Sequence, residues 1–361
     1  MLCLSFIRWG VVTNRDEWVY DDNQKHLEKK VKFLIDVYNR DVKKHSIKSN
    51  KKDVTDDLDA DIKWTRAVKN DLKKGVKYEF SKELIVESLY RPFLKKKLYF
   101  SKQLNEMQYQ TPLFFGINAE LSNQQICVSG GQHFRVNSTD CLADLHFIGD
   151  SQCFALYRYD EKGNRSDNVT DWGSTQFIAH YSVLTQPITK QAIFHYVYAV
   201  LHDPIYREKY ALNLEREFPR VPFYADFWQW AHWGEALMQA HIEYESAQPF
   251  ALTRTNIKIA KPKAKFKADK IKGEIIIDEA TILSGIPAMA WDYKLGNLSA
   301  LEWVLDQYKE SKPKDLTIRE KFNTYQFADY KKHVIDLLAK VCTVSVQTQE
   351  IVVAMKVLIR E

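Results

Sequence analysis

The sequence predicts an α+β fold: mixed, largely antiparallel strands with helices packed on them, preceded by a short helical connector. Residues 1–75 have helical periodicity, and residues 77–159 consist of short apolar runs broken by Gly, Pro, Asn and Asp. The rest of the chain returns to helical segments with a few strands between them. Because strands do not alternate regularly with helices, the pattern argues against a doubly wound parallel sheet.

The composition is that of an ordinary globular protein. Of 361 residues, 45% are hydrophobic and 27% are charged, which argues against disorder. The net charge of +5 is too small to indicate a nucleic-acid partner, so the distribution of the cations matters more. The five cysteines form no C-x-x-C pair, which favours reduced thiols in the cytoplasm. No apolar run reaches about 18 residues, so no membrane span is expected.

Two helices are expected before the first strand. Apolar residues recur at helical spacing within residues 23–48, with lysines between them, which predicts one amphipathic helix. A second helix is predicted over residues 60–73, and Gly75 is expected to end it. We interpret residues 1–75 as a helical connector.

The remaining elements follow from short patterns. Strands are predicted at residues 84–90, 111–117, 124–130, 152–159, 275–277 and 342–346, with a polar loop at 163–174. Helices are predicted at residues 188–201, after Pro204, and at 225–244, 299–309 and 327–341. Residues 76–361 would then form one mixed domain.

Several separated blocks of the sequence form an ordered pattern. The longest, residues 291–330, reads WDYKLGNLSALEWVLDQYKESKPKDLTIREKFNTYQFADY. Shorter blocks precede it: Tyr90–Arg91–Pro92–Phe93 with Lys97–Leu98–Tyr99–Phe100, Leu142–His146 with Gln152–Cys153–Phe154, His202–Asp203–Pro204 with Phe218–Pro219–Arg220–Val221–Pro222, and Asp226–Phe227–Trp228. Together these blocks resemble the C-terminal specificity region of type ISP restriction–modification enzymes. Leu298 and Gln326 depart from the family pattern, which has arginine there, and Ala155 replaces a proline.

The resemblance implies a division of labour. Residues 76–361 would be the DNA target-recognition domain, and residues 1–75 would follow a methyltransferase domain that this chain lacks. Expected partners are double-stranded DNA and the methyltransferase portion of the same system. Other domains would carry out adenine-N6 methylation and cleavage, in the cytoplasm, as bacterial defence. The parent enzyme would use S-adenosylmethionine, ATP and magnesium, whereas this chain is expected to hold no cofactor.

No catalytic motif for this chemistry is found in the chain. An adenine methyltransferase needs a glycine-rich turn for the methyl donor and an (Asn/Asp)-Pro-Pro-(Tyr/Phe) loop that holds the extruded base. No G-x-G pattern occurs, and the nearest approach to the loop is Asp203–Pro204–Ile205–Tyr206. We interpret this segment as a helix start, with Asp203 as the N-cap and Pro204 in the first turn. The chain is therefore expected not to be an enzyme by itself.

A zinc site is also disfavoured. Structural zinc sites use close pairs of ligands, and the cysteines and histidines between residues 127 and 153 form none. They are Cys127, His133, Cys141, His146 and Cys153. Cys127 and Cys153 lie in apolar strand-like runs, where cysteine behaves as a small hydrophobic residue.

Candidate DNA-binding residues come mainly from basic segments. Residues 257–273 contain seven lysines that alternate with apolar residues, so strands would place lysines on one face, suited to phosphates. The alternative is an edge strand whose lysines prevent aggregation. Polar loops add residues of the types that read base edges. The full set is Arg91, Lys95, Lys96, Lys97, Gln132, Arg135, Arg165, Arg220, Lys258, Lys261, Lys263, Lys265, Lys267, Lys294 and Asn297.

Two alternative functions stay open at this stage. The chain could be a protein-interaction fragment that assembles with a separate methyltransferase, in which case an exposed apolar patch near residues 1–45 would be expected. It could also be an unrecognised hydrolase, in which case a pocket would gather His133, His146 and Asp144.

Overall fold

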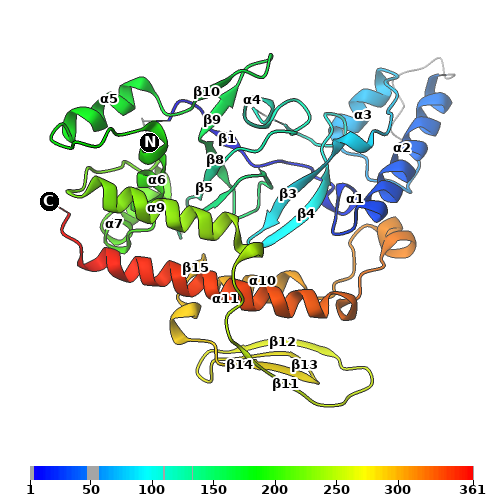
Figure 1. The fold of residues 1–361 in the computed structure, drawn as a ribbon. Coiled ribbons are helices and arrows are strands. Elements are labelled where there is room, and N and C mark those ends of the chain that lie inside the picture. Colours follow the sequence, from blue (N-terminus) through cyan, green and yellow to red (C-terminus); the bar gives the residue numbers. More distant parts are fainter. Residues whose placement is uncertain (1–3, 47–56, 109, 132, 361) are drawn as a thin grey trace.

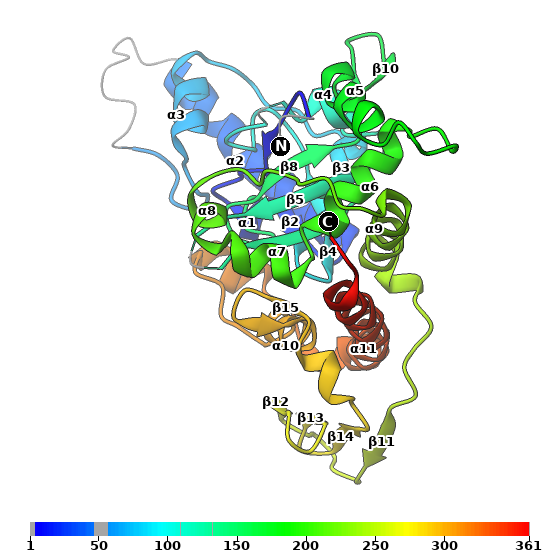
Figure 2. The ribbon, with the colours of Figure 1, turned by 90° about the vertical axis from the view of Figure 1, so that its left-hand side faces the viewer.

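The computed structural model describes residues 4–46, 57–108, 110–131 and 133–360 (Figure 1). Helices and mostly antiparallel sheets make up these residues, which confirms the predicted α+β class. A main body holds most of the helices and sheets, and a small sheet projects from it beside the long C-terminal helix (Figures 1 and 2).

The connector is helical but does not stand apart. Its elements are β1 (Arg8–Trp9), α1 (Asp16–Val19), β2 (Tyr20–Asp21), α2 (Gln24–Ser46) and α3 (Arg66–Lys73). Helix α2 confirms the first predicted helix, and α3 begins later than predicted but ends before Gly75, whose φ is +69°. The two short strands were not predicted. They join sheets formed by the following residues, and α2 shares one apolar core with β4 and α4, so residues 4–46 and 57–75 are packed into the body.

Two four-stranded sheets form the centre of the body. One has the order β2-β4-β3-β7, with β3 at Ile85–Arg91, β4 at Leu94–Tyr99 and β7 at Leu142–Ala143. The other has the order β1-β8-β5-β6, with β5 at Gln125–Ser129, β6 at Arg135–Thr139 and β8 at Gln152–Ala155. Within these sheets only β3 and β7 pair in parallel. Cys127 and Cys153 are cross-strand partners and fully buried, which confirms their predicted apolar surroundings.

Helices cover one side of the second sheet. They are α5 (Asp171–His180), α6 (Lys190–Val200), α7 (Pro204–Lys209), α8 (Ala211–Arg216) and α9 (Phe227–Ile242), followed by the short helix η3 (Tyr244–Ser246). The predicted loop at 163–174 instead contains β10 (Arg165–Asp167), paired with β9 (Tyr157–Tyr159), and the start of α5. Helices α6 and α9 pack closely because Gly234 lies against the backbone of His195.

The C-terminal part contains the projecting sheet and the longest helix. The strands of this sheet are β11 (Thr253–Asn256), β12 (Ala264–Asp269), β13 (Glu274–Asp278) and β14 (Thr281–Ser284). In the sheet they have the order β11-β14-β13-β12. After it come η4 (Ala288–Trp291), β15 (Lys294–Leu295), β16 (Leu298–Ser299), α10 (Ala300–Gln307), η5 (Ile318–Phe322) and α11 (Phe327–Val357). By length and composition α11 is apolar enough to cross a membrane, a test that core helices also pass; here it packs against α7, α9 and α10.

Two predicted strands are wrong. Residues 111–117 contain the helical turn α4 (Pro112–Phe115), which begins with proline and ends at Gly116, with φ +81°. Residues 342–346 lie inside α11. Long-range packing overrides their strand propensity, since the helix buries Cys342, Val344 and Ser345, and the buried Ser345 hydroxyl donates to the carbonyl of Val341.

Gly234→Ala should destabilise the domain. A Cβ at this position would lie 1.8 Å from the carbonyl oxygen of His195, so α6 and α9 would have to separate. We expect the free energy of unfolding to fall by about 3 kcal/mol in urea titrations. Ala236→Ser, on the exposed side of the same helix, is the control and should change it by less than about 0.5 kcal/mol. Equal effects would show that the close helix packing is unimportant.

Candidate nucleic-acid interface

The projecting sheet carries the lysines of residues 257–273. Strand β12 is an edge strand, and the loop of residues 257–263 precedes it. The side chains of Lys258, Lys261, Lys263 and Lys267 are exposed and make no ion pair with any described residue. We call these four the lysine edge. Their position fits both the phosphate-binding prediction and the alternative of an edge protected against aggregation.

The predicted alternation along β12 is interrupted. The pairing with β13 shifts between Ala264 and Lys267, and Phe266 has a φ of +45°. Its ring packs against Phe327 at the start of α11, with the centroids 4.5 Å apart. Lys265 lies 3.5 Å from Glu279, so its charge is partly compensated. The bulge therefore fixes the sheet to α11 and breaks the single lysine face that the sequence predicts.

The cations of β3 and β4 are neutralised by neighbours. Arg91 donates to Asp144 at 2.7 Å, Lys95 lies 2.9 Å from Glu245, Lys96 lies 3.3 Å from Asp22, and Lys97 lies 3.1 Å from Glu87. Phosphate binding would have to compete with these pairs, which makes the four residues poor candidates for DNA binding.

A third basic group forms where two distant segments meet. Arg135, at the start of β6, donates through Nη1 to the carbonyl of Ile148 at 2.9 Å. A Cβ added to Gly296 would lie 2.6 Å from Arg135 Nε, so the guanidinium packs directly on the turn between β15 and β16. Lys294 and Asn297 are exposed in the same hairpin. The structure thus brings Arg135, Lys294 and Asn297 together, at what we call the hairpin junction.

The other predicted residues lie elsewhere. Arg165 is exposed on β10, with its guanidinium 4.2 Å from the centroid of the Tyr157 ring. Arg220 is exposed beyond α8 and lies 3.3 Å from Glu217. Gln132 lies outside the described residues. Strand β10 and the projecting sheet lie at opposite ends of the molecule (Figure 1), so the predicted cations do not form one continuous surface.

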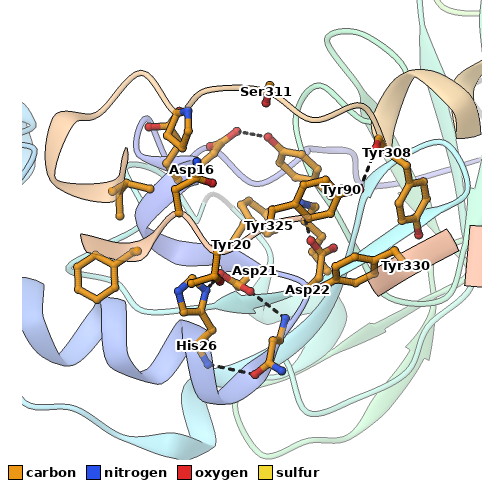
Figure 3. Close-up of a pocket in the computed structure, with 18 of the residues that line it drawn as sticks. Asp16, Tyr20, Asp21, Asp22, His26, Tyr90, Tyr308, Ser311, Tyr325 and Tyr330 are labelled. Carbon is orange, nitrogen blue, oxygen red and sulfur yellow. Dashed lines mark hydrogen bonds and ion pairs between the residues drawn. The ribbon is translucent and has the colours of Figure 1, made fainter. Parts of the chain in front are cut away.

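A large cavity lies where α1 and α2 face residues 306–330 (Figure 3). Its volume is about 1090 Å³, and it is lined by seven carboxylates, several tyrosines and five lysines. Among them Tyr90 donates its hydroxyl to Asp16 at 3.0 Å, and Lys30 lies 2.7 Å from Asp21. Glu17 accepts the backbone N–H groups of Lys314 and Asp315, which ties the two walls together. The acidic lining disfavours phosphate binding.

Asp203 has the structural role that the sequence predicts. Its side chain caps α7 by accepting the N–H of Ile205, and Pro204 occupies the first turn. The carboxylate is fully buried and also accepts from Tyr224 Oη at 2.8 Å and from Arg360 at 2.7 and 3.0 Å. No free oxygen of Asp203 is left to hold a base, which argues against a methyltransferase loop.

The proposed hydrolytic set is not assembled. Asp144 accepts from Arg91 and from the backbone N–H of His146, and burial raises the pKa of its carboxyl. The His146 imidazole lies on the surface, 3.4 Å from Asp150, and His133 is exposed. Among the described residues, no group of three or more His, Cys, Asp or Glu is placed to hold a metal ion.

Fold and surface together define a mixed α+β domain that presents cations on a projecting sheet and on a tight hairpin. Residues 4–337 match the family model of the Type ISP C-terminal specificity domain, so the chain belongs to that family. A comparison with curated proteins gives no significant match.

Solved structures agree with this membership. The chain is 47% identical to the protein in a cryoEM structure of a DrdV–DNA complex, with a TM-score of 0.91 over 97% of this chain and 36% of that one. It is 29% identical to a nuclease-deletion mutant of the Type ISP restriction–modification enzyme LlaGI in complex with a DNA substrate mimic; the TM-score is 0.82, over 98% of this chain and 33% of that one. The ATP-dependent Type ISP enzyme LlaBIII, bound to DNA, shares the fold at 23% identity, with a TM-score of 0.82 over 99% of this chain and 24% of that one.

The chain spans about a third of the length of the DrdV and LlaGI chains that it matches. The sequence resemblance to type ISP specificity regions is confirmed. The match does not distinguish the residues that touch a ligand, and their assignment stays a prediction.

Asp203→Asn should lower stability strongly. The substitution would remove the charge that compensates Arg360 in a buried site, so we expect a loss of about 3 kcal/mol in the free energy of unfolding. Asp226→Asn is the matched control, because Asp226 caps α9 from an exposed position. It should cost less than about 1 kcal/mol. Similar losses for the two variants would contradict the structural role of the buried pair.

Proposed function

We propose that the chain is the DNA sequence-recognition module of a type ISP restriction–modification system. The observation that carries this proposal is the 47% identity, over 97% of the chain, to the protein in the DrdV–DNA complex. Family membership over residues 4–337 supports the same role. The module would bind double-stranded DNA and direct methylation of adenine and cleavage, which other domains of the parent enzyme perform.

The exposed cations would bind DNA through electrostatic attraction to its phosphates. Each lysine of the lysine edge that neutralises a phosphate releases counterions, which adds affinity that falls with salt but carries no sequence information. The hairpin junction offers groups of a different kind. Asn297 is of the type that makes paired hydrogen bonds to adenine, and it is exposed at a tight turn that could enter a groove. Arg135 donates Nη1 to the carbonyl of Ile148 and has its Nε buried, so it would support the hairpin and not read a base itself.

The chemistry would reside outside this chain. S-adenosylmethionine, ATP and magnesium would be bound by other parts of the parent enzyme, as membership of the family implies. The one segment of this chain that resembles an adenine-binding loop has Asp203 fully engaged. The module by itself should therefore methylate nothing, and it would act in the cytoplasm, where the DNA is.

The decisive experiment is an electrophoretic shift with mixed-sequence duplexes over a salt series. It should be run with the chain alone and with the methyltransferase portion of a type ISP enzyme added. We expect binding that weakens as salt rises. If no duplex shifts at low salt in either arrangement, the proposal is wrong.

Replacing the four residues of the lysine edge by glutamine should reduce duplex affinity and its salt dependence. The slope of log affinity against log salt should become shallower by about 0.9 for each phosphate that the variant no longer neutralises. The control replaces Lys43, Lys73, Lys74 and Lys77, which are exposed in or just after the helical connector, and changes the net charge equally. Equal slopes for both variants would show that only overall charge matters, as expected if the lysines merely protect an edge strand.

Exposed apolar residues near the N-terminus favour a second function, the binding of another protein. Exposed apolar side chains occur in the segment of residues 4–12 and in residues 107–108 and 110–117, and pairing of Val12 with Met107 joins the two segments. They are Phe6, Trp9, Met107, Leu113 and Ile117. We infer that this apolar surface docks the methyltransferase portion, so the chain could assemble with a separately encoded methyltransferase.

Met107→Glu combined with Ile117→Glu should weaken that association at least about tenfold, because two charges would be placed in an apolar interface. Calorimetric titration of the methyltransferase portion into the variant measures the effect. Ile271→Glu, at a fully exposed isoleucine of the projecting sheet, is the control and should leave association unchanged. Unaltered binding of the double variant would exclude this surface as the docking site.

A further inference from the structure

A smaller pocket, of about 350 Å³, lies beside the hairpin junction where α7, β15 and α11 meet. Its lining combines two buried polar residues, His202 and Tyr293, with three cations, Arg207, Lys294 and Lys356. Val136 and Val352 add apolar walls. The volume is at the small end of the range for ligand-binding pockets.

The tautomer of His202 can be assigned from its surroundings. Nδ1 lies 2.9 Å from the carbonyl oxygen of Tyr198, which only accepts, so Nδ1 carries the hydrogen. Burial lowers the pKa of His202 to about 3, and the ring is neutral at ordinary pH. Nε2 is therefore an acceptor. It is buried and has no hydrogen-bond partner among the described residues.

Tyr293 is the second unsatisfied group. Its hydroxyl is buried and has no partner in the described part of the chain. The ring is held in place by stacking on His241, with centroids 5.1 Å apart and an angle of 2° between the planes. His241 cannot satisfy either group, because its two nitrogens already bond to Tyr198 Oη and Thr348 Oγ1. Buried polar atoms without partners are rare and costly in folded proteins.

The cations surround these two atoms. Arg207 uses Nη2 to donate to the carbonyl of Phe134 at 2.6 Å, which positions the guanidinium and leaves its other nitrogens available. Lys294 and Lys356 are exposed and form no ion pair with a described residue. Asp292 is the one carboxylate in the lining. The pocket thus offers an acceptor, a hydroxyl and an excess of positive charge.

We propose that this pocket binds one nucleotide unit. An N–H on the edge of the base donates to His202 Nε2, a neighbouring acceptor of the base receives the hydroxyl of Tyr293, and the phosphate lies among Arg207, Lys294 and Lys356. A backbone phosphodiester alone fits less well, because it has no hydrogen to offer to the imidazole nitrogen. The nucleotide is either free or part of bound DNA and turned out of the stack. The proposal goes beyond duplex binding through the lysine edge, and only its DNA-borne form rests on the proposed function.

The test uses the whole chain and the four deoxynucleoside 5′-monophosphates, titrated separately by calorimetry. We expect at least one to bind saturably. Tyr293→Phe should weaken that binding about tenfold, since it removes one hydrogen bond and keeps the ring. Lys356→Gln should weaken it several-fold. The matched control is Tyr244→Phe, because the Tyr244 hydroxyl is also buried without a partner in the described chain but does not line this pocket.

The proposal is overturned if none of the four nucleotides binds to the folded protein, or if Tyr293→Phe and Tyr244→Phe have equal effects. A competition arm then identifies the source of the nucleotide. Displacement of the bound nucleotide by a mixed-sequence duplex indicates a DNA-borne unit, whereas simultaneous binding indicates a free nucleotide. A failure of duplex binding would contradict the recognition function and leave the nucleotide titration as an independent test of the pocket.

Discussion

The arrangement of the domain depends on helix α11, which belongs to two cores at once. Its first two-thirds pack in the core with the projecting sheet and α10, whereas Met355 packs in the core of α6 and α9. Each end is fixed by a specific interaction: Phe327 packs on Phe266 of the projecting sheet, and Arg360, just beyond the helix, pairs with the buried Asp203. The helix therefore sets the distance between the lysine edge and the small pocket near α7.

The local sequence pattern predicted a helix correctly where that helix buries one apolar face in a single hydrophobic core. The helix predicted over residues 225–244 is α9, which buries Phe227, Trp230 and Leu237 on one face, and the amphipathic helix predicted within residues 23–48 is α2, which buries its apolar residues in the same way. The pattern was insufficient for α11, since residues 342–346 have strand propensity that only long-range packing overrides. Strands β1 and β2 have two residues each, too few to show any periodicity, and they exist because β8 and β4 offer edges to pair with.

The sequence predicted which residue types could bind DNA but not which of them are free to do so. A lysine that faces solvent and a lysine that pairs with a carboxylate cannot be distinguished from the sequence. Lys95, Lys96 and Lys97 are compensated by acids up to about 150 residues away, such as Glu245, whereas Lys258 and Lys261 are free of ion pairs within the described chain. The packing of Arg135 on Gly296 likewise depends on folding, because a glycine in a tight turn is already explained by its φ of +79° and does not reveal what packs on it. Arg207 and Lys356 were missed because nothing in their local sequence distinguishes them.

Two neighbouring residues at α7 differ in whether their buried polar atoms have hydrogen-bond partners, and this difference matters for locating a ligand site. Asp203 lies in a sequence that resembles a catalytic loop. Both oxygens of its carboxylate nevertheless accept hydrogen bonds, from the N-terminus of α7, from Tyr224 and from Arg360. Its neighbour His202 belongs to no catalytic motif, yet it has a lone pair without a donor among the described residues. An unsatisfied atom alone does not mark a ligand site, because Tyr244 Oη also has no partner among the described residues; His202 and Tyr293 differ from it in lining a pocket that contains three cations. Function is therefore better sought at His202 and Tyr293 than at the motif-like Asp203.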